Sequence, residues 1–180
     1  MLSRKKNTLF LDNFSLKELA ERYGTPSFIY SEEKIIKNFL AVKRAFSSIP
    51  TDICFAVKAN SNIGILQLLA RQGSGFDIVS GGELARVLKA GGDPTKIVFS
   101  GVGKQDWEIL EGLHKKIRCF NVESAAELEK ISQIASSNRY IAPVSLRVNP
   151  NIDAKTHPYI STGLAAVSYT HLRAHETSLH

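Results

Sequence analysis

The chain is poor in the residues that mark exported, metal-binding or membrane-spanning proteins. It has only two cysteines among 180 residues, and both Cys54 and Cys119 lie in apolar, strand-like runs, where free buried thiols are common. They predict neither a disulfide framework nor a metal site, and they favour a reducing, cytoplasmic compartment. No apolar run is long enough to cross a bilayer. The apolar stretch 8–11 near the basic start is broken at once by Asp12 and Asn13, so no export segment is predicted.

The sequence also lacks a concentrated basic surface. Its formal net charge is +6, but three of the cations are Arg4, Lys5 and Lys6, in a stretch that we expect to be a frayed terminus, and the others are scattered. Recognition of nucleic acid needs a stripe of Lys and Arg on one face or an aromatic stacking platform. We therefore expect neither nucleic acid nor a membrane as a partner. The 43% apolar and 22% charged shares are ordinary for a soluble globular protein.

What the chain does contain is a repeat of strand–helix units. Apolar runs predict strands at Ile53–Lys58, Gly75–Val79, Lys96–Ser100, Ile117–Asn121 and Pro143–Val148. Amphipathic stretches between them predict helices at Ile63–Arg71, Gly82–Ala90, Gln105–His114 and Ala125–Ala135. The first four strand ends lie 21 residues apart, which favours βα winding with a parallel sheet. Both a doubly wound sheet and a barrel use this unit; no G-x-G-x-x-G follows the first strand, so the barrel is favoured.

The expected helix starts are marked by a serine with a glutamate three residues later. Ser15, Ser80 and Ser124 each begin such an S-x-x-E capping box. Before the first barrel strand we predict a helix at Leu16–Tyr23, a turn at 24–26, a short strand at Ser27–Tyr30 and a helix from Glu32 to Phe46. We interpret residues 1–30 as a preamble outside the barrel repeat.

The carboxyl ends of the strands are where a parallel barrel places its active-site groups. Strand alternation predicts Cys54, Ala56 and Lys58 on one face, so Lys58 has two small residues below it. A lysine that enters a barrel interior is costly unless it is paired, neutralised or used covalently, which makes Lys58 a candidate nucleophile. A lysine that snorkels to the barrel mouth and is only solvated is the alternative.

Four ordered segments carry a family resemblance. They are FAVKAN at Phe55–Asn60, GFDIVSGGEL at Gly75–Leu84, NVESAAEL at Asn121–Leu128 and RVNPNIDAKTHPYISTGL at Arg147–Leu164. Together they resemble the alanine-racemase-type (fold III) pyridoxal-phosphate decarboxylases, most closely the diaminopimelate decarboxylase branch. The resemblance implies an α/β fold, a pyridoxal-phosphate-binding (β/α)8 TIM-type barrel over residues 31–164, truncated after about strand five and without the family's C-terminal β domain. It also implies a homodimer in the complete protein.

The resemblance implies roles for several residues. Lys58 matches the lysine that forms the Schiff base with the cofactor, pyridoxal 5'-phosphate. Asp77 matches a carboxylate near that lysine, and Glu83 and Arg147 match further residues of the cofactor cavity. Glu83 is equally well interpreted as a helix-capping residue, and Arg147 as the partner of Asp77 or of another carboxylate. His157, in HPYISTG, is expected either to contact the substrate or to order its loop.

The implied activity is decarboxylation of meso-2,6-diaminopimelate to L-lysine, with a small amino acid as substrate. The alternatives are an arginine, ornithine or carboxynorspermidine decarboxylase, an amino-acid racemase, a non-catalytic carrier of pyridoxal phosphate, or a metabolite-binding barrel in which Lys58 is only solvated.

The end of the chain departs from the family pattern. Residues 167–177 (VSYTHLRAHET) match the translation of a common sequencing adapter, so we interpret residues 165–180 as an artefactual tail. This tail contains His171, His175 and His180, whose spacing we therefore do not interpret as a metal site. We expect residues 1–180 alone to be inactive, because three barrel strands and the family's groups for the phosphate and the pyridine nitrogen are missing from them.

Overall fold

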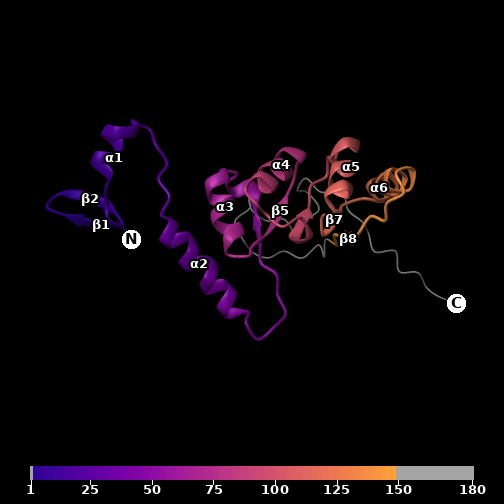
Figure 1. The fold of residues 1–180 in the computed structure, drawn as a ribbon, viewed down its shortest axis with the longest axis horizontal. Helices are drawn as coiled ribbons and strands as arrows, with labels where there is room; N and C mark the ends of the chain where they lie inside the picture. The colour runs from indigo at the N-terminus through magenta and orange to yellow at the C-terminus, as the bar shows by residue number, and fades with distance from the viewer. Residues whose placement is uncertain (1, 149–180) are drawn as a thin grey trace. The chain divides into compact units, whose positions relative to one another are not determined.

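A computed structural model describes residues 2–148, and the chain divides after Thr51 into two compact units (Figure 1). The first unit, Met1–Thr51, contains a three-stranded antiparallel sheet with the order β1-β2-β3, followed by two helices. Its elements are β1 (Leu2–Lys5), β2 (Thr8–Leu11), β3 (Phe14–Ser15), α1 (Leu16–Tyr23) and α2 (Glu32–Ala45).

The prediction of a frayed N-terminus is wrong. Arg4 and Lys5 belong to β1, which pairs with β2 along its whole length. Lys6 and Asn7 form the connecting turn with positive φ angles of 43° and 66°, the conformation that two-residue hairpin turns require. Basic side chains do not by themselves indicate disorder, because an edge strand commonly carries them.

The rest of the first unit agrees with the prediction at its helices and differs at one strand. Helix α1 has the predicted limits, with Ser15 Oγ accepting a hydrogen bond from Glu18 N at 3.3 Å, and α2 ends one residue before the predicted Phe46. The short strand predicted at Ser27–Tyr30 is not formed. A β-prone run becomes a strand only when a neighbouring strand satisfies its backbone groups, and none pairs with these residues in the part of the chain that the structure describes.

The second unit, from Asp52 onward, is built on a five-stranded parallel sheet whose strands follow one another in chain order. Its strands are β4 (Cys54–Ala56), β5 (Gly75–Ile78), β6 (Ile97–Phe99), β7 (Cys119–Val122) and β8 (Val144–Leu146). Its helices are η1 (Val57–Ala59), α3 (Ile63–Arg71), α4 (Gly81–Lys89), η2 (Pro94–Lys96), α5 (Asp106–Lys115) and α6 (Ala125–Ser137). The strands and helices predicted for this unit are confirmed to within two residues at their ends.

The order of the strands decides between the two architectures that the repeat left open. A doubly wound sheet reverses its strand order at a switch point and carries helices on both faces. Here β4 to β8 are added in sequence, and α3, α4, α5 and α6 follow one another along one side of the sheet (Figure 1). This is the winding of a (β/α)8 barrel, with the helices outside.

The two faces of the sheet differ in chemistry. One face carries six completely buried apolar residues, Phe76, Ile78, Ile97, Phe99, Phe120 and Val122, which form the core beneath the helices. Because side chains alternate along a strand, the other face carries Ala56, Asp77, Asn121 and Ser145, of which none is buried. The polar face corresponds to the interior of a barrel. No helix within residues 2–148 has the length and apolar character needed to span a membrane.

Candidate active site

Lys58 lies immediately after β4, at the carboxyl edge of the sheet. The strand ends at Ala56, and Asn60 N donates to Val57 O at 3.0 Å, which closes the 3-10 turn η1 around Lys58. Val57 is completely buried and anchors this turn, whereas Lys58 is exposed. The predicted strand alternation therefore does not extend to Lys58. Within residues 2–148 the structure records no hydrogen bond or ion pair for its ε-amino group.

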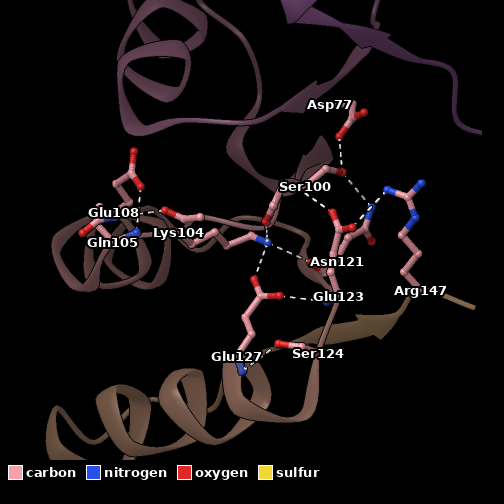
Figure 2. Close-up of polar contacts among 12 residues, drawn as sticks. Asp77, Ser100, Lys104, Gln105, Glu108, Asn121, Glu123, Ser124, Glu127 and Arg147 are labelled. Carbon is pink, nitrogen blue, oxygen red and sulfur yellow. Dashed lines mark hydrogen bonds and ion pairs between the residues drawn. The ribbon is translucent and has the colours of Figure 1, made fainter. Parts of the chain in front are cut away.

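Asp77 lies in β5 and forms a polar cluster with side chains of the next two strands (Figure 2). Ser100 Oγ donates to Asp77 Oδ1 at 2.6 Å, and Asn121 Nδ2 donates to Ser100 Oγ at 2.9 Å. Asp77 also pairs in register with Ala56, two residues before Lys58. The structure thus places a carboxylate beside the strand that carries the candidate nucleophile. Neither Ser100 nor Asn121 was identified as a site residue from the sequence.

Arg147, just after β8, pairs with a buried glutamate. Its Nη1 donates to Glu123 Oε2 at 3.1 Å, and the Glu123 side chain is only 2% exposed. The other oxygen, Glu123 Oε1, accepts from Gly101 N at 2.9 Å. Of the two partners considered for Arg147, the recorded ion pair is therefore with another carboxylate and not with Asp77. Glu123 connects the loops that follow β6, β7 and β8.

Glu83 is engaged at the start of α4. Its Oε2 accepts from Val79 N at 2.7 Å, while its own backbone N–H donates to Ser80 Oγ at 3.2 Å. This is the helix-capping role that the S-x-x-E pattern predicts, although the glutamate reaches the residue before the cap and not the cap itself. A contact of Glu83 with the cofactor stays a prediction.

Lys104 is a buried lysine that the sequence did not single out. Its side chain is 1% exposed, and Nζ donates to Gly101 O at 2.7 Å, Asn121 O at 2.8 Å and Glu127 Oε1 at 2.6 Å. Figure 2 shows this nitrogen in contact with the loop after β6, with β7 and with the first turn of α6. All three ammonium protons are used, so Lys104 joins the loop after β6, strand β7 and the start of α6. No local pattern signals a partner 23 residues away.

The glutamates at the third position of α5 and α6 each connect two consecutive strand–helix repeats. Glu108 accepts from Gln105 N at 2.8 Å and from Gly81 N at 2.6 Å, so it holds its own helix start and that of α4. Glu127 accepts from Glu123 N at 2.8 Å and pairs with Lys104 in the same manner. These links fix the carboxyl-end loops relative to one another. Extending the S-x-x-E search to other capping residues would have found Glu108.

The two cysteines are free, and neither has the properties of a nucleophile. Burial raises the pKa of both the Cys54 and the Cys119 thiols above the ordinary value of 9.0, so they stay protonated at neutral pH. His157, the three histidines of the predicted tail and the tail itself lie outside the described residues.

Comparison with known proteins decides the family. The family model for the pyridoxal-dependent decarboxylase, pyridoxal binding domain, matches residues 32–176. The chain belongs to this family. It is 56% identical over 160 residues to a diaminopimelate decarboxylase of Haemophilus influenzae, covering 89% of this chain and 39% of that protein. It is 55% identical to the diaminopimelate decarboxylase of Pseudomonas aeruginosa, with 87% and 38% coverage.

Solved structures agree. The diaminopimelate decarboxylase of Helicobacter pylori complexed with L-lysine is 52% identical with a TM-score of 0.82, over 85% of this chain and 39% of that one. That of M. jannaschii in co-complex with L-lysine is 40% identical with a TM-score of 0.85, over 93% and 40%. These matches confirm the predicted α/β barrel, of which the chain contains the N-terminal portion, and the family confirms the predicted cofactor. The chain spans about 39% of the length of the curated relative from H. influenzae.

The side chains at the carboxyl edge fit such a cofactor. An exposed primary amine on Lys58 can bond covalently to an aldehyde, and the Asp77 carboxylate stands on the neighbouring strand.

Proposed function

We propose that the protein to which this chain belongs decarboxylates meso-2,6-diaminopimelate to L-lysine with pyridoxal phosphate bound to Lys58. The observation that carries the proposal is the high identity to proteins named diaminopimelate decarboxylase, 52–56% for the first five relatives. By contrast, identity to the lysine/ornithine decarboxylase of Vibrio vulnificus is only 21%. The difference favours diaminopimelate over the substrates of the other decarboxylases.

The described residues have distinct tasks in this proposal. Bound pyridoxal phosphate acts as an electron sink for the charge left when carbon dioxide departs. Lys58 Nζ would hold the cofactor covalently and, as a free amine, would carry a proton to the reacting carbon. Asp77 presents a carboxylate to the cofactor site. Glu123 orients Arg147, and Arg147 and Glu83 contribute further charged groups to the cofactor site.

The proposal also covers the substrate class and the state of the complete enzyme. The substrate is a small amino acid, in keeping with the L-lysine in the related structures of H. pylori and M. jannaschii. The complete enzyme acts in the cytoplasm as a homodimer whose partner subunit completes each active site.

The test uses a chimera, because the chain spans only part of its relatives. Residues 25–164 of this chain replace the corresponding segment of the H. influenzae diaminopimelate decarboxylase, which is 56% identical. The chimera is loaded with pyridoxal phosphate, reduced with borohydride and digested, and release of carbon dioxide from meso-diaminopimelate is measured before reduction. We expect the pyridoxyl label on the peptide that contains Lys58, together with turnover.

Two lysine variants of the chimera complete the design. Lys58→Ala should lose both the label and turnover, whereas Lys89→Ala, at an exposed lysine in the last turn of α4, should retain both. A label on another lysine would contradict the assignment of Lys58. Labelled Lys58 without any turnover would contradict the proposed reaction and leave the cofactor assignment standing.

A further inference from the structure

The inner face of the sheet is polar at the level where β6 and β7 end. The register places Ala56, Asp77, Val98 and Cys119 side by side across four strands. Ser100, directly after β6, and Asn121, in β7, lie two residues further along the chain than Val98 and Cys119. Asn121 pairs with Ser145 of β8. Bulky branched residues usually fill the interior layers of such barrels. Here the layer nearer the carboxyl edge contains Ser100, Asn121 and Ser145, which have small side chains that can form hydrogen bonds.

The hydrogen bonds that join Asn121, Ser100 and Asp77 have a fixed direction. A carboxylate only accepts hydrogen bonds, and a serine hydroxyl has one proton to donate. Since Ser100 Oγ lies 2.6 Å from Asp77 Oδ1, that proton belongs to this bond, and the Asn121 amide at 2.9 Å must present its N–H group to Ser100. The series therefore runs from Asn121 through Ser100 and ends on Asp77.

The backbone holds both donors in place independently of their side chains. Ser100 N donates to Ile78 O at 2.7 Å, and Asn121 O accepts from the buried Lys104 ammonium at 2.8 Å. At the other end of the series, only one oxygen of Asp77 is engaged. Within residues 2–148 the structure records no partner for Asp77 Oδ2.

We propose that Ser100 and Asn121 are positioning residues that fix Asp77 Oδ1, so that Oδ2 remains oriented for the cofactor on Lys58. This inference rests on the proposed function, since it needs the cofactor at Lys58. Ser100 and Asn121 do not react; they act through Asp77. If these side chains only satisfied the hydrogen-bonding capacity of Asp77, their removal would lower the stability of the fold. As positioning residues, they determine the affinity of the site for the cofactor.

The experiment compares single variants of the chimera defined above. Affinity for pyridoxal phosphate is titrated on the apo protein, and the visible absorbance of the bound cofactor is followed against pH. Ser100→Ala removes a hydrogen bond to a charged group and should weaken cofactor affinity about 10-fold and shift the pH profile. Ser100→Thr keeps the hydroxyl and should restore both. Ser145→Ala, on the same face of the next strand but one, is the matched control and should leave both unchanged.

A double-mutant cycle tests whether Ser100 acts through Asp77. Asp77→Asn alone should weaken affinity at least as much as Ser100→Ala, and adding Ser100→Ala to Asp77→Asn should cause no more than about a 2-fold further loss. Asn121→Ala, which keeps the direct bond from Ser100 to Asp77, should give a smaller loss of the same kind and replaces Ser100→Ala if that variant does not fold. The thermal midpoint of each apo variant should match that of Ser145→Ala within a few degrees.

Three results would overturn the inference. They are a Ser100→Ala variant that behaves like Ser145→Ala, losses from Asp77→Asn and Ser100→Ala that multiply, and a Ser100→Thr variant that restores nothing. The peptide map separates this outcome from failure of the proposed function. If the label lies on Lys58 and the Ser100 variants leave cofactor affinity and the pH profile unchanged, only the positioning role is wrong.

Discussion

Replacing Lys104 by alanine tests its three contacts, with Gly101, Asn121 and Glu127. The lysine side chain is 1% exposed and that of Glu127 is 9% exposed. In Lys104→Ala, the Glu127 carboxylate loses its cation, and the carbonyl oxygens of Gly101 and Asn121 lose their donor. Removing one partner of a buried ion pair costs about 3–5 kcal/mol, because the remaining charge is left without compensation. We therefore expect the free energy of local opening of residues 100–104 and 121–127 to fall by about this amount.

Hydrogen–deuterium exchange of the chimera measures this local free energy directly. Two amides report on the network, Gly101 N, which donates to Glu123, and Glu123 N, which donates to Glu127. In the Lys104→Ala chimera, peptides that span them should exchange about 150-fold faster or more, the factor that corresponds to at least 3 kcal/mol. Peptides in the first unit should be unchanged.

Two further variants give the result its meaning. Lys115→Ala breaks an exposed pair with Glu111, whose side chains are 45% and 42% exposed, and should change stability by less than about 1 kcal/mol. Lys104→Met with Glu127→Gln removes both charges, and should recover part of the loss, because no unpaired ion then remains. If Lys104→Ala exchanges no faster than Lys115→Ala, the network does not hold these loops and the reasoning is refuted.

Three other predictions follow from the same structure. Gly81→Ala would place a Cβ 2.5 Å from the Trp107 ring and 3.1 Å from Glu108 Cγ, so it should destabilise the chimera by about 1–3 kcal/mol in urea unfolding, and Trp107→Ala in the same chain should relieve this cost. The guanidinium of Arg118 donates to Asp52 and holds the pKa of that carboxyl below its ordinary value of 3.8. The small stabilisation from this ion pair is therefore complete above pH 3.8 and is lost as the pH falls below that value. Asp52→Asn should reduce the loss of unfolding free energy at acid pH. An unchanged loss would contradict the pairing. Residues 1–180 expressed alone should associate and show no turnover, because Leu146 and Val148 at the last described strand are 58% and 66% exposed; a monodisperse, cooperatively unfolding species on size-exclusion chromatography and thermal melting would refute this.

The sequence alone determined the features that depend on neighbours in the chain. The spacing of apolar residues predicts the strand–helix repeat, and serine with glutamate three residues later predicts the starts of α1, α4 and α6. These signals are local, because a helix cap and the periodicity of an amphipathic helix involve residues within one or two turns. The position of Lys58 at the carboxyl edge follows from the same repeat.

Only the tertiary structure decided which polar side chains meet. The bonds from Ser100 to Asp77, Arg147 to Glu123 and Lys104 to Glu127 join residues 23 or 24 positions apart. Their partners are set by the register of parallel strands, which brings the ends of separate units together at one edge. Neither the composition nor the local sequence pattern predicts that register. The hairpin of β1 and β2 and the missing strand at 27–30 differ from prediction for a related reason, since a strand forms only where another strand satisfies its backbone.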